Sequence, residues 1–314
     1  MMKLAFIFPG QGSQSVGMGT ELAAADENSA SLLRRADGAL PFSLSELIEE
    51  GPQEKLTLTY HAQPALLAVG AMIASKLNDA GIVPDYTAGH SLGEYTALVA
   101  SGVLAYEDGV SIVHQRGLFM NEAVPAGEGA MAAILGLDAD AVKVVTDAIT
   151  KEGHVVQPAN LNCPGQIVIS GTKAGVDLAC VQLKEAGAKR AIPLDVSGPF
   201  HSALMQPAAQ KLQEALDQLT WQDAAIPVVA NVSAEPVTDS AEIKKLLVEQ
   251  LYSPVRWEES VRQLIDLGVT HFIECGPGKV LSGLVKKIDR SVTVMPVYDN
   301  DTLQAVIEAS KGWS

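Results

Sequence analysis

The sequence predicts an α/β protein in which one α/β domain is interrupted by a small unit of ferredoxin-like pattern. Strand-like apolar runs alternate with helical apolar spacing at both ends of the chain, whereas the middle follows the order βαββαβ within about 70 residues. Glycine-containing joints at 127–129 and 197–199 flank this middle part. We therefore expect a discontinuous large domain of residues 1–127 and 198–314, with an insert of residues 128–197.

The part before the insert begins with a predicted strand, Leu4 to Phe8. This continuous apolar run ends at Pro-Gly, which is typical of a buried strand in a parallel sheet. The elements expected after it are a helix at 63–78, a short strand at 86–88, and helices at 93–101 and 106–124.

The insert and the last part of the chain follow from the same reading of apolar spacing. In the insert, strands are expected at 130–137, 154–160, 166–170 and 190–196, and helices at 138–151 and 173–186. After it, strands are expected at 227–231 and 271–275, and helices at 241–251, 257–267 and 279–288. The glycine turn 276–278 is interpreted as a structural turn at the rim of a cleft.

The composition is that of an ordinary globular protein, with 47% hydrophobic and 19% charged residues in a chain of 314. The net charge of −15 disfavours bulk binding of nucleic acid and peripheral binding to anionic membranes. The apolar runs at 4–8 and 65–74 are too short for a signal peptide or a bilayer span, so we expect no targeting segment.

Cysteine and histidine usage points away from disulfides and metals. The three cysteines are scattered, which favours a reducing, cytoplasmic setting. The six histidines are at least 24 positions apart, so the chain carries no local metal-binding motif and we expect no metal.

The strongest chemical signal is Gly89-His90-Ser91-Leu92-Gly93, which matches the Gly-x-Ser-x-Gly nucleophile elbow. It stands between a predicted strand and a predicted helix, which is the structural context that the motif requires. The sharp turn presents the Ser91 hydroxyl at a helix N-terminus, where backbone N–H groups stabilise an oxyanion. The alternative is a plain strand–helix turn that happens to contain serine.

A serine nucleophile needs a base, and the candidate is His201. It follows the second joint and opens a predicted helix, so we expect it where the two units meet; the other five histidines lack such a setting. It also follows the serine along the chain, as in α/β-hydrolases. The alternative is a surface or capping histidine.

No acidic third member is evident in the sequence. We expect Asp195 in a strand of the insert, and we expect Glu94 to point along its helix. A backbone carbonyl would then orient the His201 imidazole, giving a Ser–His dyad.

Two further features fit a serine nucleophile. The turn at 9–14 follows the first strand, and the Gln11 N–H would be a second oxyanion donor opposite the N–H of Leu92. Arg116 lies on a partly apolar helix face, where a guanidinium needs an anionic partner. A substrate carboxylate would supply that partner with bidentate geometry. The alternatives are an ordinary turn and an internal salt bridge.

Together these segments resemble the malonyl-CoA:acyl carrier protein transacylases of bacterial fatty-acid synthesis, which are related to polyketide-synthase acyltransferase domains. The resemblance runs nearly end to end and in family order. Its segments are Phe8-Pro9-Gly10-Gln11-Gly12-Ser13-Gln14, Gly89 to Tyr95, Gln115-Arg116-Gly117, Gly129 to Ala133, Asn162-Cys163-Pro164-Gly165-Gln166, Pro199-Phe200-His201-Ser202, Gln250-Leu251-Tyr252 and Glu274 to Gly278.

The resemblance implies a role for each matching position. Ser91 would be the nucleophile and His201 the base, with the backbone carbonyl of Gln250 orienting His201. The N–H groups of Gln11 and Leu92 would form the oxyanion hole. The substrate-binding residues it implies are Arg116 on the malonyl carboxylate, Met120 and Phe200 shaping the acyl pocket, and Asn162 lining it from the insert.

The same resemblance implies fold and partners. The large domain would be α/β-hydrolase-like and the insert ferredoxin-like. Malonyl-CoA and acyl carrier protein would be the partners of a cytoplasmic monomer without a cofactor, since the coenzyme A thioester is a substrate. Phe200 leaves acyl selectivity open, because that position varies in the family between small and aromatic residues.

Two other functions remain open from the sequence: a serine hydrolase such as a thioesterase, and a non-catalytic module that binds acyl carrier protein. Basic residues near the expected cleft suggest where an acidic carrier protein docks on this acidic chain. They are Lys184, Lys189 and Arg190 in the insert, and Lys279, Lys286, Lys287 and Arg290 near the helix at 279–288.

Overall fold

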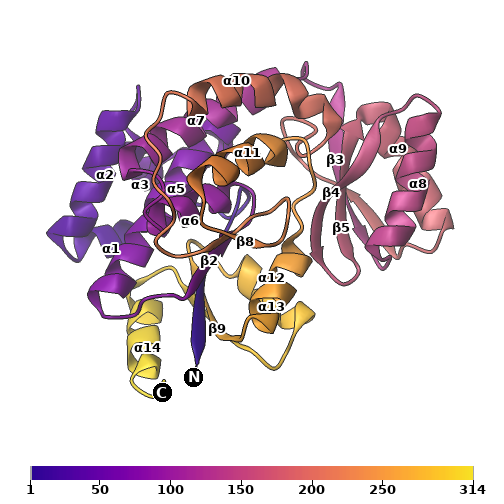
Figure 1. The fold of residues 1–314 in the computed structure, drawn as a ribbon. Coiled ribbons are helices and arrows are strands. Elements are labelled where there is room, and N and C mark those ends of the chain that lie inside the picture. Colours follow the sequence, from indigo (N-terminus) through magenta and orange to yellow (C-terminus); the bar gives the residue numbers. More distant parts are fainter. Residues whose placement is uncertain (1, 314) are drawn as a thin grey trace.

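The computed structural model describes residues 2–313 and shows a mixed α/β architecture with two separate β-sheets. The larger sheet has six strands in the order β10-β9-β1-β2-β7-β8, and the smaller has four in the order β4-β5-β3-β6. Figure 1 shows the smaller sheet with helices α8 and α9 on the right, beside the larger, helix-covered part.

The centre of the larger sheet is β1 (Lys3–Phe8), which pairs in parallel with β2 (Tyr86–Gly89) and β9 (Val269–Cys275). Residues 5–8 of β1 are fully buried, as the continuous apolar run predicts for a strand covered on both faces. The outer strands are β10 (Thr293–Val297), β7 (Val228–Val229) and β8 (Pro236–Val237), of which only β8 is antiparallel to its neighbour.

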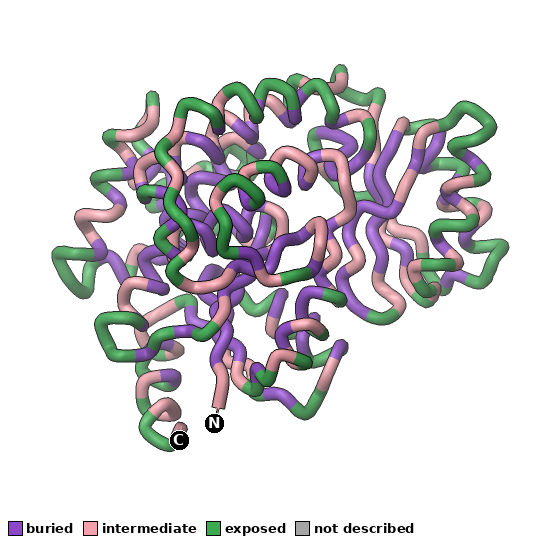
Figure 2. The backbone as a smooth tube through the Cα atoms, viewed as in Figure 1, coloured by how far each residue is buried: buried purple, intermediate pink, exposed green. Residues whose placement is uncertain are grey.

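Helices cover this sheet, and the longest of them is α5 (Thr59–Asp79). It is buried almost all round and packs against α6 (Leu92–Ala100) and α7 (Tyr106–Glu122). Figure 2 shows this interior in purple beneath exposed outer helices. The other helices of this part are α1 (Thr20–Ala24), α2 (Glu27–Ala39), α3 (Leu44–Glu50), α4 (Gln53–Thr57), α10 (Gln206–Leu216), α11 (Ser240–Gln250), α12 (Trp257–Asp266), α13 (Val280–Ile288) and α14 (Asn300–Ser310).

The smaller sheet is formed by the middle of the chain. Its elements occur in the order β3 (Gly129–Leu135), α8 (Ala139–Lys151), β4 (Val156–Cys163), β5 (Gln166–Thr172), α9 (Lys173–Glu185) and β6 (Arg190–Pro193). All neighbouring strands are antiparallel, and the two helices share an apolar core with the sheet. Strand β4 also meets the larger part, because Val255 exchanges backbone hydrogen bonds with Ala159 and Leu161.

The observed elements differ from the predicted ones in four places. No element is predicted over 20–57, where four helices form, or at β10 and α14. The strand predicted at 227–231 is only two residues long, and β6 ends at Pro193 rather than at 196. Short capped helices and two-residue strands carry little periodicity, so apolar spacing does not reveal them. Within residues 2–313, no helix is both long and apolar enough to cross a membrane.

Candidate active site

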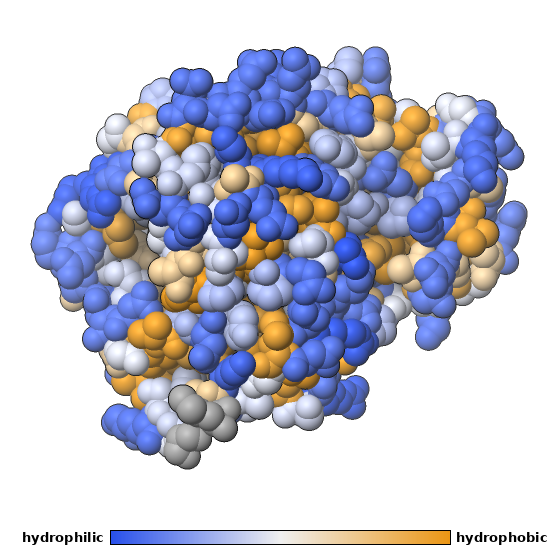
Figure 3. Space-filling view, viewed as in Figure 1, coloured by the Kyte–Doolittle hydropathy of each residue, from blue (hydrophilic) through white to orange (hydrophobic). Residues whose placement is uncertain are grey.

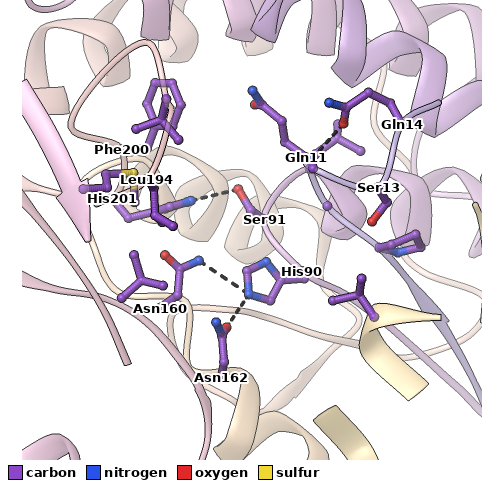
Figure 4. A pocket seen from close by; sticks show the side chains of 18 of the residues that line it. Gln11, Ser13, Gln14, His90, Ser91, Asn160, Asn162, Leu194, Phe200 and His201 are labelled. Atoms are coloured by element: carbon purple, nitrogen blue, oxygen red, sulfur yellow. Dashed lines mark hydrogen bonds between the residues drawn. The ribbon is translucent and has the colours of Figure 1, made fainter. Parts of the chain in front are cut away.

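A cavity of about 300 Å³ lies where the four-stranded unit meets the larger part. Side chains from both parts line it, and Figure 4 shows how several of them lie: His201 points toward Ser91, and Asn160 and Asn162 point toward His90. On the outer surface, Figure 3 shows hydrophilic side chains over α10, at the top of the view.

Ser91 occupies a strained turn between β2 and α6, with φ 51° and ψ −106°. The flanking glycines make the turn possible. A Cβ at Gly89 would lie 1.9 Å from the carbonyl carbon of Gly93, and one at Gly93 would lie 2.0 Å from the oxygen of Phe8. A non-glycine residue at positive φ costs on the order of 1–3 kcal/mol and persists only where the surroundings enforce it.

His201 faces the Ser91 hydroxyl. Its Nε2 lies 2.8 Å from Ser91 Oγ, and its Nδ1 lies 2.8 Å from the backbone oxygen of Gln250. A carbonyl oxygen only accepts, so Nδ1 carries the proton and Nε2 accepts from the serine. Burial, with a contribution from the Arg116 charge, lowers the pKa of His201 to about 3. The imidazole is therefore neutral and ready to take a proton from Ser91.

One expectation about acidic residues is wrong: Asp195 lies beyond the end of β6 in an exposed segment, not in a strand. Glu94 is buried, and its Oε2 accepts from the Asn231 N–H and from Gln250 Nε2. Neither carboxylate bonds to His201, whose Nδ1 is engaged by the Gln250 carbonyl.

Arg116 is 1% exposed and reaches the nucleophile. Its Nη2 lies 3.1 Å from Ser91 Oγ and 2.9 Å from Gln250 Oε1, and its Nη1 lies 2.7 Å from Gln63 Oε1. Within residues 2–313 it pairs with no carboxylate, so the internal salt bridge considered from the sequence is not formed there. Burial lowers the pKa of Arg116. A guanidinium held in this way has unused capacity for an anion.

Two of the residues that line the cavity have backbone N–H groups without a partner among the described residues. Gln11 and Leu92 both line it, and neither backbone N–H donates a hydrogen bond to any residue that the structure describes. The Ser91 N–H, by contrast, is engaged by Asn231 Oδ1 at 2.8 Å. The free N–H of Leu92 is the first of helix α6, where the helix dipole favours negative charge.

The remaining candidates also line the cavity: Met120, Phe200 and Asn162. The side-chain oxygen of Asn162, Oδ1, accepts from His90 Nε2 at 2.8 Å. This hydrogen bond joins the four-stranded unit to the nucleophile elbow. His90 thus lies in the cavity wall, and the expectation that only His201 has a site-like setting is wrong. Burial lowers the pKa of His90.

The structure brings several residues to this cavity or beneath it that are not predicted from the sequence. His90 stands inside the elbow motif, so its position was the available signal. Asn160, Gln63 and Asn231 carry no local signal, because each lies in an element whose partners are distant along the chain.

The glycine turn at 276–278 precedes a helix that lines the cavity, and its place at the rim stays a prediction. Residues 280, 281 and 284 of α13 line the cavity just after it. Among residues 2–313, no group of three or more His, Cys, Asp or Glu side chains gathers as a metal ion would require.

Comparison with known proteins gives consistent findings. Residues 5–307 match the family described as "Acyl transferase domain". The "Malonyl CoA-acyl carrier protein transacylase" of Bacillus subtilis (strain 168) is 60% identical over 311 residues, covering 99% of this chain and 98% of that protein. The protein of the same name from Staphylococcus aureus (strain MRSA252) is 46% identical, covering 100% and 99%.

Solved structures agree with these relatives. An acyl carrier protein S-malonyltransferase from Vibrio cholerae O1 superposes with a TM-score of 0.95 at 46% identity, covering 97% of this chain and 99% of that one. A malonyl-transacylase in complex with a type II polyketide-synthase acyl-carrier protein gives 0.95 at 42% identity, covering 98% and 99%.

Proposed function

Because the chain belongs to the acyl transferase domain family, we propose that it transfers a malonyl group from malonyl-CoA to the phosphopantetheine thiol of acyl carrier protein, through an ester on Ser91. Such a transfer would supply chain-extension units for fatty-acid synthesis. The observation that carries the proposal is the meeting of Ser91 Oγ with both His201 Nε2, at 2.8 Å, and Arg116 Nη2, at 3.1 Å. The full-length similarity to malonyl transacylases supports the same assignment.

In the first half-reaction, Ser91 Oγ attacks the thioester carbonyl of malonyl-CoA while His201 Nε2 takes the hydroxyl proton. The new C–O bond places negative charge on the former carbonyl oxygen. The N–H groups of Gln11 and Leu92 would donate to that oxyanion. The C–S bond then breaks, and His201 returns the proton to the coenzyme A sulfur.

The second half-reaction runs the same steps in reverse. The thiol of acyl carrier protein gives its proton to His201 and attacks the malonyl ester, and Ser91 Oγ leaves and regains the proton. The scheme is ping-pong, because coenzyme A departs before the second substrate reacts. All protons move among Ser91, His201 and a thiol, so the scheme needs no cofactor.

Arg116 would give the site its preference for an acyl group with a free carboxylate. Its guanidinium is buried and unpaired with any carboxylate among the described residues, so a malonyl carboxylate would supply the missing anion. Met120 and Phe200 would enclose the methylene of that group, and Asn162 would close the pocket from the four-stranded unit.

We also propose the finer description of the fold. Residues 1–127 and 198–314 would form an α/β-hydrolase-like domain, and residues 128–197 a ferredoxin-like insert. The parallel core around β1 and the element order β3-α8-β4-β5-α9-β6 support this division. We expect the enzyme to act as a cytoplasmic monomer.

The test is product analysis after incubation with malonyl-CoA and holo acyl carrier protein. We expect a malonyl thioester on the carrier protein and free coenzyme A. Free malonate as the main product would instead make the chain a thioesterase. Binding of carrier protein with neither product would make it a non-catalytic module.

A further inference from the structure

One buried side chain, Asn231, spans the nucleophile turn from below. It lies in the turn between β7 and β8 and is fully buried. Its Oδ1 accepts from the Ser91 N–H at 2.8 Å, and its Nδ2 donates to the Gly89 oxygen at 2.7 Å. One amide therefore bonds to the nucleophile and to the residue two positions before it.

The amide orientation is fixed by chemistry. An N–H only donates and a carbonyl oxygen only accepts, so Oδ1 must face Ser91 and Nδ2 must face Gly89. Gln250 Nε2 donates to the same Oδ1 at 3.2 Å, which agrees with this assignment. A flipped amide would place like groups together at all three contacts.

Asn231 is itself held at both ends of its backbone unit. Its N–H donates to the buried Glu94 Oε2 at 3.1 Å, and its carbonyl accepts from the Arg256 N–H at 3.1 Å. The Arg256 guanidinium also donates to the carbonyls of Val232 and Ser233, which fixes the rest of the turn. The side chain is thus a rigid support for the elbow.

This support has two consequences for catalysis. It offsets the strain of Ser91 at φ 51° by bonding to the backbone on both sides of the turn. It also occupies the Ser91 N–H, so that the N–H groups of Leu92 and Gln11 are the ones left to meet an oxyanion.

We propose that Asn231 is a positioning residue that holds the Ser91 turn in its reactive geometry, and that it does so independently of the acyl group. The inference rests on the proposed function only in taking Ser91 as the nucleophile. It assigns no role to Asn231 in substrate selectivity, which distinguishes it from Arg116.

The test compares three reagents on Asn231→Ala. Malonyl-CoA and acetyl-CoA acylate Ser91, and a phosphonofluoridate phosphonylates it, forming an Oγ–P bond as fluoride and the proton depart. We expect the maximal rate of all three reactions to fall by a similar factor, about 10- to 100-fold, as for loss of one positioned catalytic contact. The KM for malonyl-CoA should stay within about twofold.

Asn231→Leu keeps a similar side-chain volume if Asn231→Ala does not fold. It can neither accept from the Ser91 N–H nor donate to the Gly89 oxygen, so the rates should fall at least as far. The matched control is Thr87→Val, which removes the buried 2.8 Å contact between Thr87 Oγ1 and Ser101 Oγ, at the far ends of β2 and α6. It should lower the melting temperature without lowering the rates.

Rates within twofold of wild type in folded Asn231→Ala or Asn231→Leu would overturn the proposal, as would a loss confined to malonyl-CoA. The phosphonofluoridate separates this inference from the proposed function. Suppose that the wild-type protein reacted with the phosphonofluoridate faster than the Asn231→Ala variant, but that neither reacted with malonyl-CoA. The proposed function would then fail, and the positioning role of Asn231 would stand.

Discussion

The two strands next to β1, β2 and β9, each end in a glycine turn that leads into a helix. The backbone N–H groups at the start of these two helices have different hydrogen-bond partners. At the turn over 89–93, which we call the open turn, the Leu92 N–H of α6 makes no bond to the described residues. At the turn over 274–282, the closed turn, the buried Glu274 carboxylate accepts from the N–H groups of Leu281 and Ser282, at 3.0 and 2.7 Å.

The difference shows how one fold element serves either structure or chemistry. A helix N-terminus attracts an anion in both cases. The closed turn satisfies that attraction with its own carboxylate and becomes a fixed wall of the cavity. The open turn leaves its helix N-terminus unpaired, so that the N–H group there can meet negative charge that develops on a substrate. The glycines alone do not distinguish the two turns, since both sequences provide them.

The largest effect is expected beside the open turn, at Arg116. Arg116→Ala removes the buried cation that would pair with a malonyl carboxylate, whereas acetyl has no such group. Loss of a buried charge-assisted pair costs about 2–5 kcal/mol, a factor of tens to thousands. The rates of acyl-enzyme formation with malonyl-CoA and with acetyl-CoA measure how far this preference for malonyl is lost. Equal losses for both substrates would make Arg116 structural and leave the preference unexplained.

The base at the open turn predicts the pH dependence. A histidine with an ordinary pKa of 6.5 would lose about 30-fold of its neutral form at pH 5. Burial lowers the pKa of His201 to about 3. The rate at which malonyl-CoA acylates Ser91 should therefore change less than about threefold between neutral pH and pH 5, while the protein stays folded. A midpoint near pH 6.5 in the loading rate would contradict the buried, neutral histidine.

The sign for stability is opposite to that for a salt-bridged histidine. Between pH 6.5 and about 3 the unfolded chain binds a proton that folded His201 excludes, so this group makes the folded state less stable as the pH falls. Circular dichroism over the same pH range therefore serves as the control for the kinetic measurement.

The helix after the closed turn should affect the carrier protein rather than the chemistry. Lys286 and Lys287 are exposed on α13, two and three residues beyond the cavity-lining Leu284. Reversing both to glutamate should raise the KM for acyl carrier protein several-fold at low salt and leave malonyl loading within about twofold. The effect should shrink at high salt, because screening acts over about 10 Å at 0.1 M.

The control for this charge reversal makes the same change elsewhere. Lys143 lies in the second turn of α8 and Lys173 begins α9, and both form exposed ion pairs, with Asp147 and Asp177. Their reversal should leave the KM nearly unchanged. Equal effects from both double variants would mean that net charge, not the α13 surface, governs docking.

The smallest kinetic effect is expected from the closed turn itself. Glu274→Gln weakens the buried acceptor at the start of α13 and should lower the free energy of unfolding by about 1–3 kcal/mol. The ratio of malonyl to acetyl loading should stay within about twofold. Thermal melts and the two loading rates measure these outcomes, and a changed ratio would show that the closed turn takes part in selectivity.

The same comparison explains what the sequence predicted. The open turn has a local pattern whose spacing requires a strand, a serine and a helix, so Ser91 was identified from five residues. His201 followed from its place beside a joint. Asn231 and Glu94 bond to positions far away in the chain, so their contacts depend on the tertiary structure and left no local pattern.

The helices and strands of the fold also differ in how well the sequence predicts them. Long amphipathic or fully apolar segments such as α5, α7 and β1 were predicted close to their observed ends. Three of the helices before α5 were not predicted because they span only 5 to 7 residues, too few for a periodic signal. The fourth, α2, has 13 residues and a side-chain cap from Asp26, so the sequence did carry a signal for it.

Intact mass spectrometry after incubation with malonyl-CoA, without a carrier protein, tests the central claim most directly. Wild-type protein should gain one malonyl group, mapped to Ser91, and Ser91→Ala should gain none, since no other nucleophile occupies the open turn. A malonyl adduct of undiminished yield on Ser91→Ala would contradict the account.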